Sequence, residues 1–329
     1  MLVKPWLLLP PKWAHELGPF GLKIYSLFQS APTPAWNGFV WKNLVFKNRL
    51  GLAGGVDKNA ENLTEWWKMG AGFVEVGTVT PLPQKSNPGK IMDRNSNQKA
   101  LWNKMGFPSE GADEVFYNLR SYGENKSTPV FVNIGKNRET RNENAAEDYV
   151  FLIERLRSQA DAFVVNISSP NTKNLRDLQN TQALTRLLEP IIAAAQKFTP
   201  KPVLLKLSPD LDTESLEQAI NTAVELGVDG FVLTNTTLAR PNNIPFPPEG
   251  GLSGLPLKTQ SCEVLRKSLQ ILGSRRQGKL IVSVGGVMSP EDVFERLQIG
   301  ADLVEIYSAL IFEGPGFFRD VASRYHGRS

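Results

Sequence analysis

Histidine and cysteine are scarce in this chain of 329 residues, which contains two histidines and one cysteine. Both histidines, His15 and His326, lie within fifteen residues of an end of the chain. A Ser-His-Asp or Cys-His catalytic apparatus and a histidine-ligated metal site are therefore not expected in the body of the protein. The single cysteine excludes an internal disulfide and a self-contained iron–sulfur cluster, and it indicates a reducing compartment. We expect no metal site.

Long apolar runs and a strong charge imbalance are also missing. No run of 18 apolar residues occurs, so no transmembrane helix is expected, and the first ten residues make a poor signal peptide. Thirty-seven basic and thirty-three acidic residues leave a net charge of +4, which is too small to predict a nucleic-acid partner. The length suits two domains or one large domain with an appendage.

The N-terminal segment is rich in tryptophan, because four of the seven tryptophans lie in the first 41 residues. From Trp13 to Phe28, large apolar residues recur at steps of three and four, which predicts one or two short amphipathic helices with an interruption near Gly18 and Pro19. Two interpretations stay open. The segment could pack on the main core, or it could form an interfacial helix pair on a membrane surface or over an apolar ligand.

From about residue 49 onward, short apolar runs alternate with helix-like stretches. Eight such runs with helices between them predict a parallel α/β barrel, the (β/α)₈ or TIM-barrel fold, rather than an open sheet. The expected strands are Leu50–Ala53, Phe73–Val76, Val130–Ile134, Ala162–Ile167, Val203–Leu207, Gly230–Thr234, Leu280–Val284 and Leu303–Ile306. The clearest amphipathic helices are Ala145–Arg157, Gln182–Ala195, Ser215–Leu226 and Pro290–Leu297. Long intervals containing Pro81–Pro88 and Pro241–Gly254 predict loop insertions over the catalytic face.

Active sites of parallel barrels are built from the loops that follow the strands. These positions hold two lysines, several amides and hydroxyls and many glycines, but no histidine or cysteine and few carboxylates. Such a site can bind a planar polar ligand and anions, and it needs a cofactor for difficult chemistry. Gly285-Gly286 is either a structural turn or part of a phosphate site. Lys58 and Lys206 suit functional roles, with rim salt bridges as the alternative, and Lys206 inside the run VLLKL requires a fixed anionic partner, such as the N1/O2 edge of a flavin.

At these positions the sequence resembles the dihydroorotate dehydrogenases, specifically their class 2, quinone-dependent branch. Ordered motifs covering about 265 residues carry the resemblance, together with AHEL (14–17) in the N-terminal extension. The motifs are FKNRLGLAGGVDKN (46–59), GTVTPLPQ (77–84), NKMGF (103–107), NIGKN (133–137), NISSPNT (166–172), KLSPD (206–210), TNTT (234–237), GGLSGLPL (250–257), VGGV (284–287) and IYSA (306–309).

The resemblance implies an FMN-dependent oxidation of (S)-dihydroorotate to orotate in de novo pyrimidine (UMP) biosynthesis, with Ser169 as the catalytic base. The base would remove the C5 proton, which leaves past Thr172 and Phe107, while the C6 hydride passes to the flavin. The FMN-binding residues would be Gly54, Gly55, Lys58, Thr78, Asn133, Asn166, Lys206, Thr234, Gly254, Gly286, Tyr307 and Ser308. The substrate-binding residues would be Lys58, Asn103, Lys104, Met105, Gly106, Phe107, Asn166, Asn171, Asn235 and Thr236.

The same resemblance assigns the electron acceptor to a quinone, since class 1 relatives have cysteine at the position of Ser169 and lack the N-terminal extension. The quinone would enter between the N-terminal helices, flanked by His15, Arg94 and Tyr307. We expect residues 1–41 to form the segment for membrane and quinone access, and residues 42–329 to form the FMN-binding barrel. A monomer is expected, held peripherally on the cytoplasmic side of the cytoplasmic membrane if the source is bacterial.

Two departures from the family pattern are mild: Lys104 replaces an arginine, and Gly54-Gly55 stands where Ala-Gly is common. Two other functions remain to be considered. The first is a flavin oxidoreductase acting on another planar base, such as a dihydrouridine synthase or a fumarate-using relative. The second is an inactive barrel that serves as a membrane-peripheral binding protein. The retention of Ser169, both lysines and the phosphate glycines argues against the inactive barrel.

Overall fold

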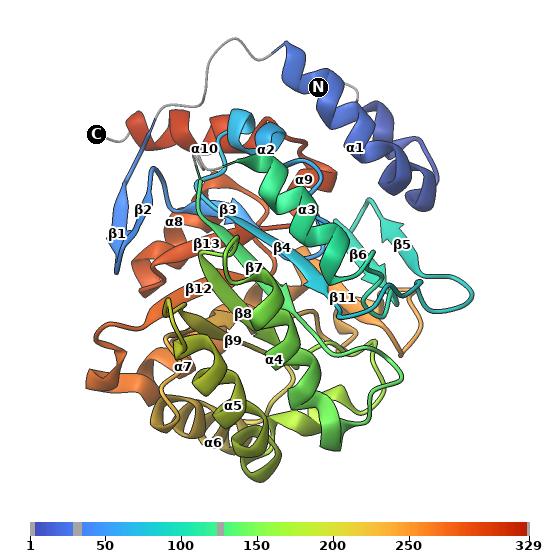
Figure 1. Ribbon diagram of the computed structural model, residues 1–329. Helices are drawn as coiled ribbons and strands as arrows, with labels where there is room; N and C mark the ends of the chain where they lie inside the picture. The colour runs from blue at the N-terminus through green and yellow to red at the C-terminus, as the bar shows by residue number, and fades with distance from the viewer. Residues whose placement is uncertain (1–3, 29–34, 124–127, 328–329) are drawn as a thin grey trace.

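The computed structural model describes residues 4–28, 35–123 and 128–327, which form a closed barrel of eight parallel strands with additional elements around it. Each barrel strand pairs with the next one along the chain, and the last pairs with the first (Figure 1). The strands are β3 (Leu50–Leu52), β4 (Val74–Val79), β7 (Val130–Ile134), β8 (Ala162–Asn166), β9 (Val203–Leu207), β10 (Gly230–Leu233), β12 (Leu280–Val284) and β13 (Leu303–Ile306). The predicted (β/α)₈ fold is confirmed.

The barrel strands form where the sequence predicts them, because both of their faces are buried and they therefore appear as continuous apolar runs. Four of them, β7, β9, β12 and β13, begin and end at the predicted residues. The α-helices that follow the barrel strands along the chain surround the barrel (Figure 1). They are α2 (Leu63–Met69), α3 (Ala112–Tyr122), α4 (Ala145–Leu156), α5 (Thr181–Gln196), α6 (Thr213–Glu225), α7 (Lys258–Leu272), α8 (Pro290–Ile299), α9 (Ser308–Phe312) and α10 (Phe317–His326).

Short 3₁₀-helices complete the connections between these elements. They are η1 (Pro5–Leu7), η2 (Asn142–Asn144), η3 (Leu175–Gln179), η4 (Pro241–Asn243), η5 (Leu255–Leu257) and η6 (Gly273–Arg276). The four amphipathic helices predicted from the sequence correspond to α4, α5, α6 and α8, and their ends differ from the prediction by at most two residues. Patterning on one buried face therefore located these helices well.

The N-terminal segment contains one continuous helix, α1 (Pro11–Leu27), so the predicted interruption near Gly18 and Pro19 is wrong. A proline inside a helix removes one N–H donor and frees the carbonyl four residues earlier. Both Gly18 and Pro19 are exposed to solvent, so the proline ring does not have to fit against a neighbouring element. The proline is therefore tolerated on the open side of the helix.

Helix α1 lies outside the barrel, against α2 and β5 (Met92–Asn95) (Figure 1). Its large apolar residues are exposed to solvent. Those side chains are between 43% and 79% exposed: Trp13, Leu17, Phe20, Ile24, Leu27 and, just beyond the helix, Phe28. The opposite face carries the buried Leu22 and Ser26. Helix α1 therefore packs on the barrel domain, as the first interpretation expects, but through Leu22 and Ser26 rather than through its large apolar residues.

Several polar contacts attach the N-terminal segment to the barrel domain, and two groups of them involve residues expected on the quinone route. The guanidinium of Arg94 on β5 donates to the carbonyl oxygens of Leu7 and Leu9, at 2.8 and 2.9 Å. Nε2 of His15 lies 3.2 Å from Nζ of Lys58, in the loop after β3. Burial, followed by the nearby Lys58 ammonium, lowers the pKa of His15 to about 3, so the imidazole is neutral and accepts the hydrogen bond from Lys58.

A hairpin of two short strands, β1 (Phe39–Trp41) and β2 (Leu44–Phe46), closes the barrel at the end where the strands begin. Phe46 is buried against Phe73 and Phe131, with ring centroids 5.9 and 6.1 Å away. These side chains fill the lower half of the barrel, which leaves only the upper half for polar groups. The predicted division after residue 41 falls inside this hairpin and stays a prediction.

The two predicted insertions both occur, and they meet in a small antiparallel sheet that the sequence did not predict. The sheet consists of β5, β6 (Ala100–Asn103) and β11 (Gly251–Gly254), in the order β11-β6-β5. β6 comes from the insertion after β4, whereas β11 comes from the insertion after β10, so their pairing joins segments about 150 residues apart. The sheet brings Asn103 and Ser253 to the carboxyl ends of the barrel strands.

Replacing Phe46 with alanine should destabilise the protein by about 3–5 kcal/mol, because it empties the aromatic plug between Phe73 and Phe131. The neighbouring Val45→Ala is a matched control, since Val45 is 65% exposed and its loss should cost less than about 1 kcal/mol. Denaturant unfolding of the two variants measures the difference. Equal midpoints would show that the hairpin does not plug the barrel.

Acidification should loosen helix α1 through His15. The pKa of His15 is 6.5 when the side chain is solvated and about 3 in the docked helix, so the undocked state binds the proton more readily. Docking should be independent of pH above about 6.5 and weaken as the pH falls from there towards 5. Hydrogen exchange of the α1 amides measures this change, and in His15→Asn the acid-dependent loosening should be lost. The same loosening in that variant would assign the effect to other groups.

Candidate active site

One cavity lies at the carboxyl ends of the barrel strands, and all eight strands or the loops that follow them contribute to its wall. The cavity brings together residues that are far apart in sequence and that the motifs predict as ligand-binding. The predicted residues that line it are Gly54, Gly55, Lys58, Thr78, Asn103, Met105, Gly106, Phe107, Asn133, Asn166, Ser169, Asn171, Lys206, Thr234, Asn235, Thr236, Gly286, Tyr307 and Ser308.

Four predicted site residues do not line this cavity. Lys104 points to the surface, where its ammonium lies 3.5 Å from Glu249, and Gly254 lies behind Ser253 on β11. His15 and Arg94 belong to the attachment of the N-terminal segment, so Tyr307 alone of the three residues expected on the quinone route lines the cavity. Their expected roles stay predictions.

The floor of the cavity contains a buried ion pair. Nζ of Lys206, on β9, lies 2.6 Å from Oε1 of Glu75, on β4, and the two side chains are 6% and 0% exposed. The same carboxylate oxygen accepts a hydrogen bond of 2.7 Å from the amide of Asn133. Glu75 is thus the anionic partner that Lys206 requires, and the sequence analysis missed it.

Gly54 has no side chain, and the carboxylate of Glu75 occupies the space beside it. A Cβ at residue 54 would lie 2.1 Å from Oε1 of Glu75, well inside van der Waals contact. The alanine that is common at this position in the family is therefore incompatible with this position of Glu75. The clash explains why this chain has glycine at residue 54. The glycine serves close approach rather than an unusual backbone angle.

Amide side chains connect the ion pair to the rest of the cavity. Asn166 donates to Asn133 at 3.1 Å and to the hydroxyl of Thr78 at 3.0 Å. Asn235 in turn donates to the carbonyl oxygen of the Asn166 side chain at 3.2 Å. Because each amide both donates and accepts, the chain fixes the orientation of all three asparagines. The upper barrel therefore presents preoriented polar groups to a ligand.

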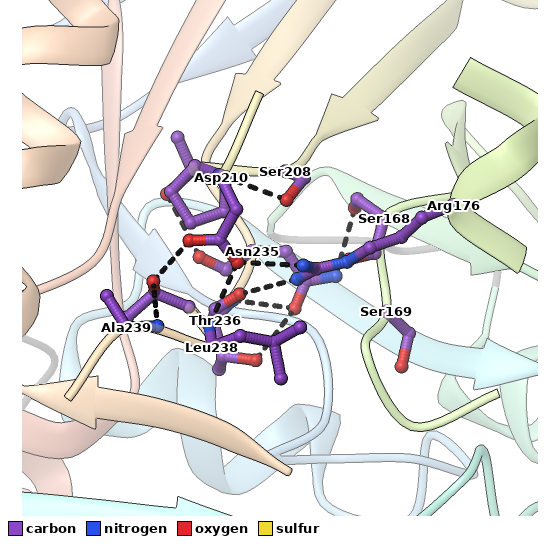
Figure 2. A network of polar contacts seen from close by, with 12 residues as sticks. Ser168, Ser169, Arg176, Ser208, Asp210, Asn235, Thr236, Leu238 and Ala239 are labelled. Carbon is purple, nitrogen blue, oxygen red and sulfur yellow. Dashed lines mark hydrogen bonds and ion pairs between the residues drawn. The ribbon is translucent and has the colours of Figure 1, made fainter. Parts of the chain in front are cut away.

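Ser169 lies in the loop after β8 and lines the cavity, with 5% of its surface exposed. Its hydroxyl oxygen accepts a hydrogen bond of 3.2 Å from the backbone N–H of Asn171. Figure 2 shows this hydroxyl turned away from the neighbouring network of polar contacts. The side chain is therefore free to face a ligand.

The guanidinium of Arg176 holds three loops of the site together (Figure 2). It donates to the carbonyl oxygen of Ser168 at 2.9 Å, to that of Thr236 at 3.0 Å and to the carboxylate of Asp210 at 2.7 Å. These residues follow β8, β10 and β9, respectively. Burial alone would raise the pKa of Asp210, but hydrogen bonds from Thr237, the Leu238 amide and Arg176 lower it below its usual value. Asp210 is thus an ionised anchor for Arg176.

The opposite end of the cavity has a glycine turn after β12. Gly286 has a φ of +71°, and a Cβ there would lie 2.3 Å from the backbone of Lys258. The fully buried Arg296 donates to the preceding carbonyl oxygen, that of Gly285, at 2.7 Å. Close backbone approach with free N–H groups is typical of phosphate cradles, so the turn can hold an anion.

Lys58 is the second cationic group in the wall. Burial lowers the pKa of its ammonium to about 8, although the carboxylates of Asp57 and Glu61 act in the opposite direction. The ammonium is therefore charged at neutral pH, and its contact with His15 joins the cavity to helix α1. The two lysines occupy different settings, since Lys206 faces carboxylates and Lys58 faces a neutral ring.

Several residues of the site escaped the sequence analysis: Glu75, Ser253, Arg176 and Glu305. Glu75 and Glu305 stand inside predicted apolar strands, and this was the signal that identified Lys206. Neither residue stands after a strand, where the sequence predicts the site. Arg176 and Ser253 lie in connecting segments without a comparable signal.

Comparisons with known proteins agree with this architecture. A family model described as dihydroorotate dehydrogenase matches residues 40–326. A protein of Thermus thermophilus named "Dihydroorotate dehydrogenase (quinone)" is 45% identical over 83% of this chain and 78% of its own length. A protein of the same name from Acidithiobacillus ferrooxidans is 39% identical over 99% of this chain and 94% of its own.

Solved structures give the same result. The crystal structure of DHODH from Eimeria tenella in complex with ferulenol has a TM-score of 0.85 and 32% sequence identity, and the match covers 95% of this chain and 90% of that one. The resemblance inferred from the motifs is confirmed, including the quinone-type relatives. With a family model matching most of its length and relatives at these identities, the chain belongs to the dihydroorotate dehydrogenase family.

Proposed function

We propose that this protein oxidises (S)-dihydroorotate to orotate on a bound FMN and passes the electrons to a membrane quinone, as a step of de novo pyrimidine biosynthesis. One observation carries the proposal. A single cavity combines Ser169, the buried Lys206, the half-buried Lys58, an ordered chain of amides and a glycine cradle. This combination suits an anionic planar substrate beside a flavin nucleotide in a chain that belongs to this family.

The residues present fit FMN. The turn at Gly286 offers a cradle that a Cβ would fill, as a phosphate group requires. Thr78, Asn133, Asn166 and Lys206 offer donors along the floor for a polar ring edge. FMN would supply the hydride acceptor that no side chain of the cavity offers.

The substrate would lie between Lys58 and the amides of the outer wall. The side-chain oxygen of Asn171 is buried and has no hydrogen-bond donor among the described residues, although its NH₂ group donates to Asn103 at 2.8 Å. It can therefore accept a ring N–H of dihydroorotate. The Lys58 ammonium suits the substrate carboxylate.

Ser169 would remove the C5 proton of the substrate. The Asn171 N–H, 3.2 Å from the serine oxygen, supports the negative charge that this oxygen acquires. The hydroxyl of Thr172 is buried without a hydrogen-bond partner in the described part of the chain, so it is free to relay the proton outward past Phe107. The amide chain holds the reacting groups in place while this happens.

Helix α1 would bind the membrane surface. Its apolar residues form one exposed face, and Lys12 and Lys23 are exposed along the same helix. No described helix is long and apolar enough to span a membrane. Our proposal includes peripheral attachment through residues 1–41, with the quinone entering past His15, Arg94 and Tyr307. The family resemblance adds the expectation of a monomer with a barrel of residues 42–329.

The purified protein should carry FMN, and dihydroorotate added without oxygen should bleach its yellow colour. A flavin that stays oxidised would contradict the proposed function. A soluble quinone should restore the colour of the bleached protein much faster than fumarate does. Faster reoxidation by fumarate would instead indicate a soluble, fumarate-using enzyme.

The variant Ser169→Ala should keep its FMN and bleach about 10²–10⁴-fold more slowly, because it lacks the proposed base. Stopped-flow absorbance in the absence of oxygen measures the rate. Bleaching at the wild-type rate would remove Ser169 from the mechanism.

Loss of the Arg176 clamp should also slow bleaching, because the loops carrying Ser169 and Thr236 lose their common anchor. For Arg176→Gln we expect a decrease of about 10–100-fold in the limiting rate, with FMN content near that of wild type. The control is Arg186→Gln, at an exposed position of α5, which should bleach normally. An unchanged rate in Arg176→Gln would show that the loops hold their geometry without the clamp.

A further inference from the structure

A second buried acid, Glu305, faces the Lys206–Glu75 ion pair. Glu305 lies on β13, lines the cavity and has no exposed surface. Oε2 of Glu305 is 3.9 Å from Nζ of Lys206, which is too long for a hydrogen bond. If both acids were ionised, neither oxygen of Glu305 nor Oε2 of Glu75 would have a hydrogen-bond donor among the described residues.

The charges of this cluster do not balance. Two carboxyl groups and one ammonium, each at most 6% exposed, carry a net charge of −1 when all three are ionised. The barrel neighbours paired with Glu305 are Gly51 on β3 and Val284 on β12, and neither is titratable. A buried, uncompensated charge is costly, and a proton on one acid removes it.

Other charged groups nearby are already engaged. Arg296, on the helix α8 that packs against β13, donates to the hydroxyls of Ser283 and Ser261 and to the carbonyl oxygen of Gly285. The Lys58 ammonium, elsewhere in the cavity wall, contacts His15. The groups that set the charge state of Glu305 are therefore Glu75 on β4, which is separated from β13 by β3 alone, and Lys206 on β9.

The geometry decides which acid holds the proton. Glu75 accepts hydrogen bonds from Lys206 and Asn133 through one oxygen, at 2.6 and 2.7 Å, and these bonds favour its ionised form. Glu305 has no such donor in the part of the chain that the structure describes. Burial and the negative charge of Glu75 raise the pKa of Glu305 well above its usual value, although Lys206 opposes them.

We propose that Glu305 is a neutral carboxylic acid at physiological pH, that it donates its proton to Glu75, and that loss of this proton in alkaline solution makes the cavity floor negative. Because reduction adds negative charge to a flavin, a negative floor would make a bound FMN harder to reduce. Glu305 would thus be a positioning residue that sets how the flavin potential depends on pH. This last step rests on the proposed function, whereas the protonation of Glu305 does not.

Infrared difference spectroscopy of the protein without FMN tests the protonation directly. Wild type near neutral pH should show the C=O band of a buried carboxylic acid, and Glu305→Gln should lose it. Glu75→Gln should lose it too, because Glu305 would then ionise as the sole counterion of Lys206. The exposed Glu217 on α6 provides the control, since Glu217→Gln should keep the band. A band that survives in Glu305→Gln would overturn the proposal.

Midpoint potentials of the FMN-loaded proteins test the consequence. Wild type and Glu305→Gln should have similar potentials near neutral pH, where both side chains are neutral. As the pH rises, the potential of wild type should shift below that of the variant. If the plots of midpoint potential against pH stay parallel for the two proteins, Glu305 does not influence the flavin potential. A protein that binds no FMN would refute the proposed function, but the infrared experiment would still decide the protonation.

Discussion

The ion pair between Lys206 and Glu75 is the interaction around which the cavity is organised. An ammonium inside a closed barrel requires an anion at contact distance, and Glu75 meets this need at 2.6 Å from the opposite wall. The same oxygen orients Asn133, which orients Asn166 and then Asn235. One electrostatic requirement thus fixes the direction of side chains up to the mouth of the cavity, and it explains the glycine at residue 54.

The apolar lower half of the barrel strengthens the ion pair and its hydrogen bonds. Phe46 of the N-terminal hairpin closes the barrel beneath Phe73 and Phe131. The ion pair and Glu305 therefore have apolar side chains below them and the cavity above them. Electrostatic interactions are stronger where water is excluded, and an unpaired charge is correspondingly more costly. The aromatic plug and the protonation state of Glu305 are therefore two consequences of the same dry interior.

Much of the fold and many of the site residues could be predicted from the sequence, because the information is local. A strand buried on both faces shows as an apolar run, and its carboxyl end points to the mouth of the barrel, as Asn166 does at the end of β8. The pairing of β6 with β11 could not be predicted, since no local pattern relates segments about 150 residues apart. Glu75 was visible as a charge in an apolar run, but only the closed barrel shows that it faces Lys206.

The two lysines of the cavity differ in what a ligand must displace. Lys206 is held by an ionised carboxylate and has a second acid nearby, so an arriving anion gains little from it. Lys58 donates to a neutral imidazole at 3.2 Å, and burial lowers its pKa to about 8 although the nearby carboxylates of Asp57 and Glu61 oppose this. A carboxylate entering the cavity therefore binds best at Lys58. Lys58 would have to leave His15 to bind such a carboxylate. A ligand at this end of the cavity therefore competes with helix α1 for the Lys58 ammonium.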